Sequence, residues 1–145
     1  MKRRLVRFFL LTTLVSVSLA STGCGSSGGF DPKALEAGWV LESFGGASNL
    51  VPTDPAITTD ITMAAGKTNG SGGVNSFSGT YEASGDSSIS FGPLASTRMA
   101  GPPEAMAQEA KFFAALEVAK HFEISKGKLV LSDSGNNTLM VLAPK

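Results

Sequence analysis

After its first thirty residues, this chain shows the apolar spacing of a helix in one stretch, residues 102–118. Pro102 and Pro103 suit a first helical turn, and Glu104 lies where an acidic side chain stabilises the helix dipole. Spacings of three and four predict a stripe that faces the core: Met106, Ala110, Phe112, Phe113 and Leu116. The polar remainder is Gln108, Glu109, Lys111 and Glu117. Because only one helix is predicted, we expect strands to supply the rest of the core.

Short segments in which apolar and polar residues alternate surround the predicted helix. The expected strands are residues 39–44, 57–63, 74–81 and 89–91 before it, and 122–124, 129–131 and 139–141 after it. The expected turns are Asn69-Gly70, Gly85-Asp86, Lys126-Gly127 and Ser134-Gly135-Asn136-Asn137, and residues 49–55 are an expected loop. This order predicts an α+β domain: an antiparallel, strongly twisted, barrel-like sheet packed around one helix, residues 102–118.

Composition excludes several kinds of site and partner. The chain has 145 residues, enough for one ordinary domain, with one Cys and one His. One Cys cannot form an internal disulfide, and one Cys with one His cannot complete a tetrahedral zinc site. Basic and acidic residues number 12 each, and no long basic run is present. We therefore expect no metal, no cofactor and no nucleic-acid partner.

The N-terminus has the pattern of an export signal. Four basic residues lie between Lys2 and Arg7, and an uncharged, mostly apolar run follows from Phe8 to Ala20. This run is too short for a membrane-spanning helix, which needs about 20 residues, and small residues come after it. The alternatives are an amphipathic anchor or a buried helix of the fold. We predict that residues 1–23 are a signal peptide.

The single cysteine, Cys24, follows Leu19-Ala20-Ser21-Thr22-Gly23, a stretch that resembles the lipobox of bacterial lipoproteins. Gly23 fits the small residue before the lipidated cysteine, whereas Ser21 departs from the leucine usual three positions before it. Cleavage after Ala20 is the alternative, and it leaves a free thiol in an oxidising compartment. The resemblance implies a lipid anchor at Cys24 that holds an exported protein to a membrane, facing the periplasm or the cell exterior.

The glycines and serines after Cys24 cannot bury a core, so residues 24–37 are expected to be the lipidated end and a flexible tether. Residues 38–145 are the expected domain. Loss of residues 1–23 removes four basic and no acidic residues, which leaves a formal charge of −4. A basic face for nucleic acid or for anionic lipid is therefore disfavoured.

Three motifs of this domain follow one another in a recognisable order. They are Trp39-Val40-Leu41, the stretch 73–81 (GVNSFSGTY) and the stretch 94–101 (LASTRMAG) with the helix after it. Together they resemble the META domain, the HslJ-like family of bacterial envelope proteins, over residues 38–143. The resemblance implies a cracked barrel around one helix, in proteins often exported or lipid-anchored and linked to stress and antibiotic tolerance. It implies no enzyme activity.

At two positions the sequence departs from this family. Val74 and Gly101 stand where many relatives carry cysteines. Loss of both at once implies that the two positions are neighbours joined by a disulfide in those relatives. We therefore expect Val74 and Gly101 to lie close, with Cα atoms within about 7 Å.

The candidate binding or structural residues are Asn75, Tyr81 and Arg98. Asn75 shares a predicted strand face with Tyr81; it either orients a ligand or, as we expect, satisfies loop backbone from a buried position. Arg98 either binds an anion or a partner's carboxylate, or bridges its loop to an acid. The interior distinguishes two versions of this role. An apolar cavity open at one end would favour a ligand carrier, its lining being Phe77, Tyr81, Phe91, Phe113 and Leu116, and a fully packed interior would favour a surface scaffold.

No catalytic residue is predicted. His121 lacks a partner nucleophile, and Gly70-Ser71-Gly72-Gly73 lacks the lysine and helix of a phosphate loop. A solvated face is expected from Glu104, Glu109, Glu117 and Glu123. The sequence thus predicts a monomeric, lipid-anchored envelope protein whose non-catalytic domain binds or scaffolds a protein or peptide partner. The alternatives are an inhibitor, a pilotin-like chaperone and an enzyme-accessory domain that binds a peptide or lipid tail.

Overall fold

The structure, a computed structural model, describes residues 30–45 and 49–145. The predicted signal peptide, Cys24 and the start of the predicted tether lie outside the described residues. Before the helix α1 (Pro103–Val118) come the 3-10 helix η1 (Pro32–Leu35) and the strands β1 (Gly38–Gly45), β2 (Leu50–Pro52), β3 (Asp60–Ala64), β4 (Lys67–Ser71), β5 (Ser76–Ala83), β6 (Ile89–Phe91) and β7 (Ala95–Ser96). After it come β8 (His121–Ser125), β9 (Lys128–Ser132) and β10 (Thr138–Pro144).

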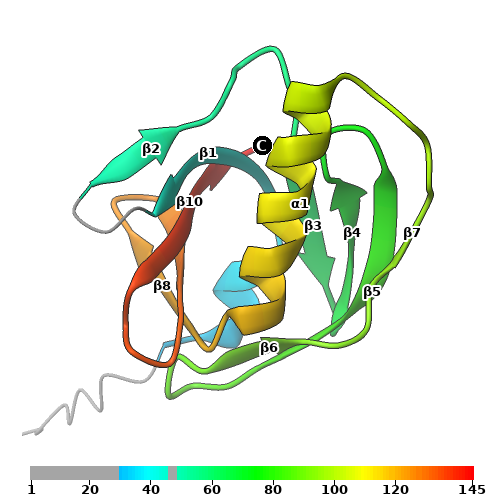
Figure 1. The fold of residues 1–145 in the computed structure, drawn as a ribbon. Helices are drawn as coiled ribbons and strands as arrows, with labels where there is room; N and C mark the ends of the chain where they lie inside the picture. Colours follow the sequence, from blue (N-terminus) through cyan, green and yellow to red (C-terminus); the bar gives the residue numbers. More distant parts are fainter. Residues whose placement is uncertain (1–29, 46–48) are drawn as a thin grey trace, which may run out of the picture.

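The strands form one antiparallel sheet that nearly closes into a barrel, with α1 running across it (Figure 1). The order is β6-β5-β4-β3-β1-β10-β9-β8, with β2 also paired to β1 and β7 to β5. The two ends of this path meet where Ser88 bridges His121 and where the Ile89 amide donates to the Lys120 carbonyl at 2.9 Å. This closure covers the outer edges of the two end strands of the path, β6 and β8, and leaves β2 and β7 off the path. The predicted fold class is confirmed.

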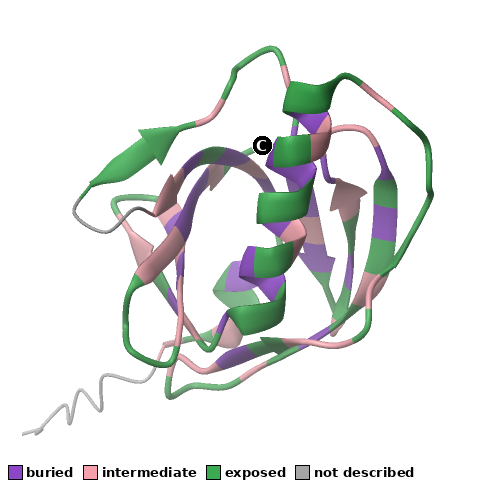
Figure 2. Ribbon diagram, in the orientation of Figure 1, coloured by how far each residue is buried: buried purple, intermediate pink, exposed green. Residues whose placement is uncertain are grey.

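The core lies between the inner face of the sheet and one side of α1 (Figure 2). Its large, fully buried apolar side chains come from η1, the sheet and the helix: Leu35, Ile61, Met63, Phe112, Leu116, Leu129, Leu131, Met140 and Leu142. Burial of each such side chain stabilises the fold by roughly 1.5–3 kcal/mol before the entropy of ordering is counted. Among the described helices, none combines the length and the apolar character needed to cross a membrane.

Residues 30–37, which the sequence interpretation placed in the tether, are part of the folded body. Leu35 is fully buried, and the indole Nε1 of Trp39 donates to its carbonyl at 3.1 Å. Phe30 packs edge-on against Phe122, with ring centroids 5.2 Å apart. The tether prediction rested on the glycines and serines before residue 30 and did not take into account the burial of Phe30 and Leu35.

Two local predictions were wrong. Asn69-Gly70 lies inside β4, and the β3–β4 hairpin turns instead at Ala65 and Gly66, whose φ angles are +48° and +75°. A two-residue hairpin turn favours positive φ at both positions, so Ala65 holds a conformation that a non-glycine residue seldom adopts. Residues 49–55, expected to be a loop, contain the short strand β2.

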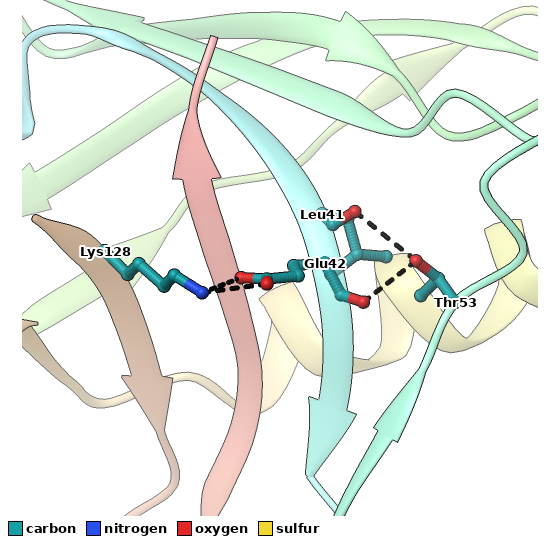
Figure 3. Close-up of polar contacts among 4 residues, drawn as sticks. All are labelled: Leu41, Glu42, Thr53 and Lys128. Carbon is teal, nitrogen blue, oxygen red and sulfur yellow. Dashed lines mark hydrogen bonds and ion pairs between the residues drawn. The ribbon is translucent and has the colours of Figure 1, made fainter.

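A bulge in β1 ties this strand to the segment after β2. The register of β1 against β10 shifts between Leu41 and Ser43, which leaves Glu42 as the extra residue. The carbonyl of Glu42 accepts from the backbone amide and the hydroxyl of Thr53, both at 3.1 Å. Its carboxylate reaches across β10 to Lys128 of β9 at 2.6 Å (Figure 3). Both side chains are nearly half exposed, so this pair contributes about 0.2–1 kcal/mol.

Candidate functional site

Helix α1 buries a side that overlaps only in part with the predicted one, since Phe112 and Leu116 are buried as expected and the other three stripe residues are not. Its buried residues are Ala105, Gln108, Glu109, Phe112, Ala115 and Leu116. Ala110 of the predicted stripe is exposed, and Met106 and Phe113 are half-buried. The helix is therefore apolar on two sides, and only one of them faces the core. The predicted solvated position of Glu109 was wrong.

The carboxylate of Glu109 lies at the centre of a buried hydrogen-bond cluster. Glu109 is 6% exposed. Its Oε2 accepts from the backbone amides of Val74 at 3.0 Å and Asn75 at 2.6 Å, and its Oε1 accepts from the Asn75 Nδ2 at 2.7 Å. The sequence carried one signal for this position, because Glu109 falls on the helical stripe formed with Ala105 and Phe112.

Hydrogen bonds keep this carboxylate charged. Burial alone would raise the pKa of Glu109. The donors of the Asn75 side chain, the Asn75 backbone and the Val74 backbone outweigh burial and hold the pKa of Glu109 below its ordinary value. Charge-assisted bonds from neutral donors thus replace the counter-ion that a buried carboxylate would otherwise require.

The side chain of Asn75 joins this carboxylate to the loop before the helix. Asn75 is 3% exposed, and its Oδ1 accepts from the Met99 amide at 2.6 Å and from the Thr97 hydroxyl at 2.8 Å. Its Nδ2 donates to the Met99 carbonyl at 3.2 Å as well as to Glu109. Both amide atoms are engaged within the fold, so the geometry gives Asn75 a positioning role for residues 97–99.

A second pair of polar contacts fixes the neighbouring turn of the helix. The Nε2 of Gln108 donates to the Thr59 hydroxyl at 3.0 Å and to the Ile57 carbonyl at 3.2 Å. Thr59 in turn donates to the Gly72 carbonyl at 3.0 Å. A Cβ atom at Gly72 would lie 2.6 Å from the Cγ of Glu109, so the close approach of helix and sheet requires glycine there.

The other two candidates lie apart from this cluster. Tyr81 is 6% exposed near the far end of β5, and burial, followed by the negative charge of Glu36, raises the pKa of its hydroxyl. Arg98 is exposed, and its side chain has no hydrogen bond or ion pair among the described residues. The structure therefore brings Asn75 and Arg98 to one loop and leaves Tyr81 in the core.

The remaining titratable groups form no cluster of the metal-binding kind. In the part of the chain that the structure describes, no three His, Cys, Asp or Glu side chains are grouped so that they could hold a metal ion. His121 is half-buried at the seam of the barrel, opposite Ser88.

A groove runs along the outer side of α1, between the helix and the segment of residues 91–100. It consists of two adjoining hollows of about 650 and 490 Å³ that share Ser96 and Phe113. The helix side of this groove is formed by Met106, Ala110, Phe113 and Glu117. Met106, Ala110 and Phe113 of the stripe that was predicted to face the core therefore line this groove, whereas Phe112 and Leu116 of the same stripe are buried as predicted.

The five residues whose shared cavity would favour a ligand carrier divide between the core and this groove. Phe77, Tyr81 and Leu116 are buried in the core, and the Phe77 ring lies 5.4 Å from the Phe113 ring. Phe91 and Phe113 line the groove instead. These five residues therefore do not line one shared cavity, which is the arrangement that would have favoured a ligand carrier.

Val74 and Gly101 are neighbours, as expected. A Cβ atom built on Gly101 would lie 3.3 Å from the Cβ of Val74. Since a Cα–Cβ bond is about 1.5 Å long, the two Cα atoms are at most about 6.3 Å apart, within the reach of a disulfide. The methyl groups of Val74 fill the space that a Gly101 side chain would enter, at 2.6 and 2.8 Å. Packing of Val74 against Gly101 thus joins the two segments beside the Glu109 cluster.

Comparison with known proteins agrees with these features. The fold resembles the NMR structure of a protein from Burkholderia xenovorans, with a TM-score of 0.62 and 20% identity over 97% of this chain and 99% of that one. It also resembles the crystal structure of a DUF4847 family protein from Bacteroides vulgatus, with a TM-score of 0.55 and 20% identity over 75% of this chain and 92% of that one. No curated protein sequence matches the chain. The sequence model of the META domain family matches residues 33–145, and the chain belongs to this family.

Proposed function

We propose that this protein is an exported lipoprotein, held at a membrane through Cys24, whose META domain works by contact with a protein partner of the cell envelope. The observation that carries the contact role is the groove beside α1, where an apolar helix side that the core does not use is left open. The best-placed buried polar groups, Glu109, Asn75 and Gln108, are occupied by internal hydrogen bonds. They support a scaffold more than a catalytic site.

The chain length between Cys24 and the folded body supports a position near the bilayer. Phe30 already packs against Phe122, and residues 25–29 separate it from Cys24. Even a fully extended link of this length spans only about 20 Å. A lipid on Cys24 would therefore hold the domain against the membrane surface, where encounters with other anchored proteins are frequent.

Metabolic labelling with a clickable fatty acid tests the anchor. We expect label on the wild-type chain and none on Cys24→Ser, with both proteins present in equal amounts. Label on both, or on neither, would overturn the anchor. Cross-linking of the anchored form in intact cells, followed by identification of the captured protein, then tests the contact role.

The non-catalytic part of the proposal has its own test. A panel of hydrolase and transferase assays on the full-length protein should give no turnover above background. Turnover that disappears in His121→Ala or Arg98→Ala would overturn this part. A role in envelope stress or antibiotic tolerance rests on the family resemblance, and loss of tolerance in a deletion strain, restored by the wild-type chain, would support it.

A further inference from the structure

The helix side of the groove is an apolar surface that nothing in the described residues covers. Met106 and Phe113 are half-buried, Ala110 is exposed, and Met99 at the groove's edge is 55% exposed. From Met106 to Glu117 the helix rises about 16 Å, which equals the length of about five residues of extended chain. The groove is therefore long enough for a short strand.

The opposite wall offers a free strand edge. Strand β7 pairs only with β5 among the described strands, through Phe77 with Ser96 and Ser78 with Ala95. Ser96 lines both hollows, so β7 lies along the groove. An unpaired edge beside an apolar surface is the arrangement in which a protein adds an extended peptide to its own sheet.

The charges at the two ends of the groove differ in sign. Arg98 lies at the end where the helix begins and has no ion-pair partner among the described residues. Glu117 lies at the other end, beside Phe91 and Pro93. An extended peptide complementary to the groove carries an acidic residue near Arg98 and a basic residue near Glu117.

We propose that this groove binds an extended peptide segment that adds to the free edge of β7, antiparallel, with alternate apolar side chains against Met106, Ala110 and Phe113. Every other strand pair in the sheet is antiparallel, and this direction places the acidic residue at the peptide's N-terminal end and the basic residue at its C-terminal end. The inference rests on the proposed function, since it gives the contact role its site and its partner chemistry.

Fluorescence polarisation of a labelled peptide on the full-length chain in detergent tests the proposal. The probe is Asp-Val-Thr-Val-Thr-Val-Lys, and the control probe, Lys-Val-Thr-Val-Thr-Val-Asp, has the same composition with the terminal charges exchanged. We expect the first peptide to bind about two- to fivefold more tightly at low salt, as exposed ion pairs permit, and the difference to shrink as salt rises. The double substitution Arg98→Glu with Glu117→Lys should reverse the preference.

Two matched substitutions on the helix locate the site. Ala110→Arg places a long cationic side chain in the groove and should reduce binding at least tenfold. Ala107→Arg is the same change at another exposed position of α1 outside both hollows, and it should leave binding unchanged. Equal thermal melting of the two variants shows that the fold is retained.

No binding by the wild type, equal loss in both arginine variants, or no preference between the two peptides would each overturn the groove proposal. These results are separable from the proposed function. A chain that carries the fatty-acid label and captures a partner but ignores both peptides keeps its anchor and contact role and loses only this site. A chain that binds the peptide through the groove and carries no label loses the anchor alone.

Discussion

The carboxylate of Glu109 accepts two hydrogen bonds from Asn75, one from the backbone amide at 2.6 Å and one from the side-chain amide at 2.7 Å. The two residues are 34 positions apart, Glu109 on α1 and Asn75 directly before β5. Asn75 also binds both the backbone amide and the backbone carbonyl of Met99. The side chains of Glu109 and Asn75 therefore link the helix, the sheet and the loop that forms a wall of the groove. The first predictions test this pair.

Glu109→Gln should destabilise the protein by about 1–3 kcal/mol. Glutamine can accept through one oxygen only, and its amide nitrogen would face donors of Asn75 or Val74. Urea unfolding of the wild type and the variant at pH 7 measures this change. Glu117→Gln, at an exposed position of the same helix, is the control and should change stability by less than about 0.5 kcal/mol. Equal effects of the two substitutions would contradict the role of the cluster.

The difference in stability between the wild type and Glu109→Gln should depend on pH. The pKa of Glu109 is lower in the folded state than its ordinary value, so the charged carboxylate stabilises the fold at a pH above the unfolded-state pKa of about 4.3. That contribution is lost as the pH falls through the folded-state pKa. We expect a constant difference from pH 7 to about pH 5 and a smaller one toward pH 3. A difference that grows on acidification would mean that the buried group is neutral.

Asn75→Asp should be more harmful than Asn75→Ala at pH 7. Alanine loses the contacts to Met99, Thr97 and Glu109 and should destabilise by about 2–4 kcal/mol. Aspartate keeps the shape but sets a second negative charge against the Glu109 carboxylate, and like charges so close cannot both ionise without a large penalty. The excess cost of aspartate over alanine, measured by urea unfolding, should therefore shrink at low pH. A milder effect of aspartate at pH 7 would show that the carboxylate of Glu109 is not charged.

The predictable parts of this fold are those that local sequence determines. Alternating residues predicted β1, β3, β5, β6, β8, β9 and β10 in their order but not β2, β4 and β7. The turns at Gly85-Asp86 and Lys126-Gly127 lie where expected. Asn69-Gly70 failed because pairing with both β3 and β5 places it inside β4, which moves the turn to Ala65-Gly66. The favourable pairing of a whole strand outweighed the local turn preference.

The buried side of α1 was not predictable in the same way. A helix with apolar residues on two sides has no unique inward face, and hydrophobic spacing selected Met106, Ala110 and Phe113, which line the groove. Burial of Glu109 depends on donors 34 and 35 positions away, which no local pattern reports. The proximity of Val74 and Gly101 was predicted only through the family resemblance, which implied a contact between these distant positions.

Gly101→Ala should destabilise the protein, because the added Cβ would meet the Val74 methyl carbons at 2.6 and 2.8 Å. We expect a loss of about 1–3 kcal/mol, and Val74→Ala in the same chain should recover part of it by removing those methyl groups. A double-mutant cycle by urea unfolding measures the coupling. Strict additivity would show that the two side chains do not compete for this space.

The pair Val74→Cys and Gly101→Cys should form a disulfide and stabilise the domain. The Cβ positions are 3.3 Å apart, and Gly101 does not have a positive φ, so a side chain is tolerated once the valine methyl groups are gone. Closing a loop of this length is expected to add about 3 kcal/mol to the free energy of unfolding. In a Cys24→Ser background, the oxidised protein should melt at a higher temperature than the wild type, and dithiothreitol should remove the gain. Failure to oxidise, or an oxidised form no more stable than the reduced one, would show that the backbone at these positions cannot adopt disulfide geometry.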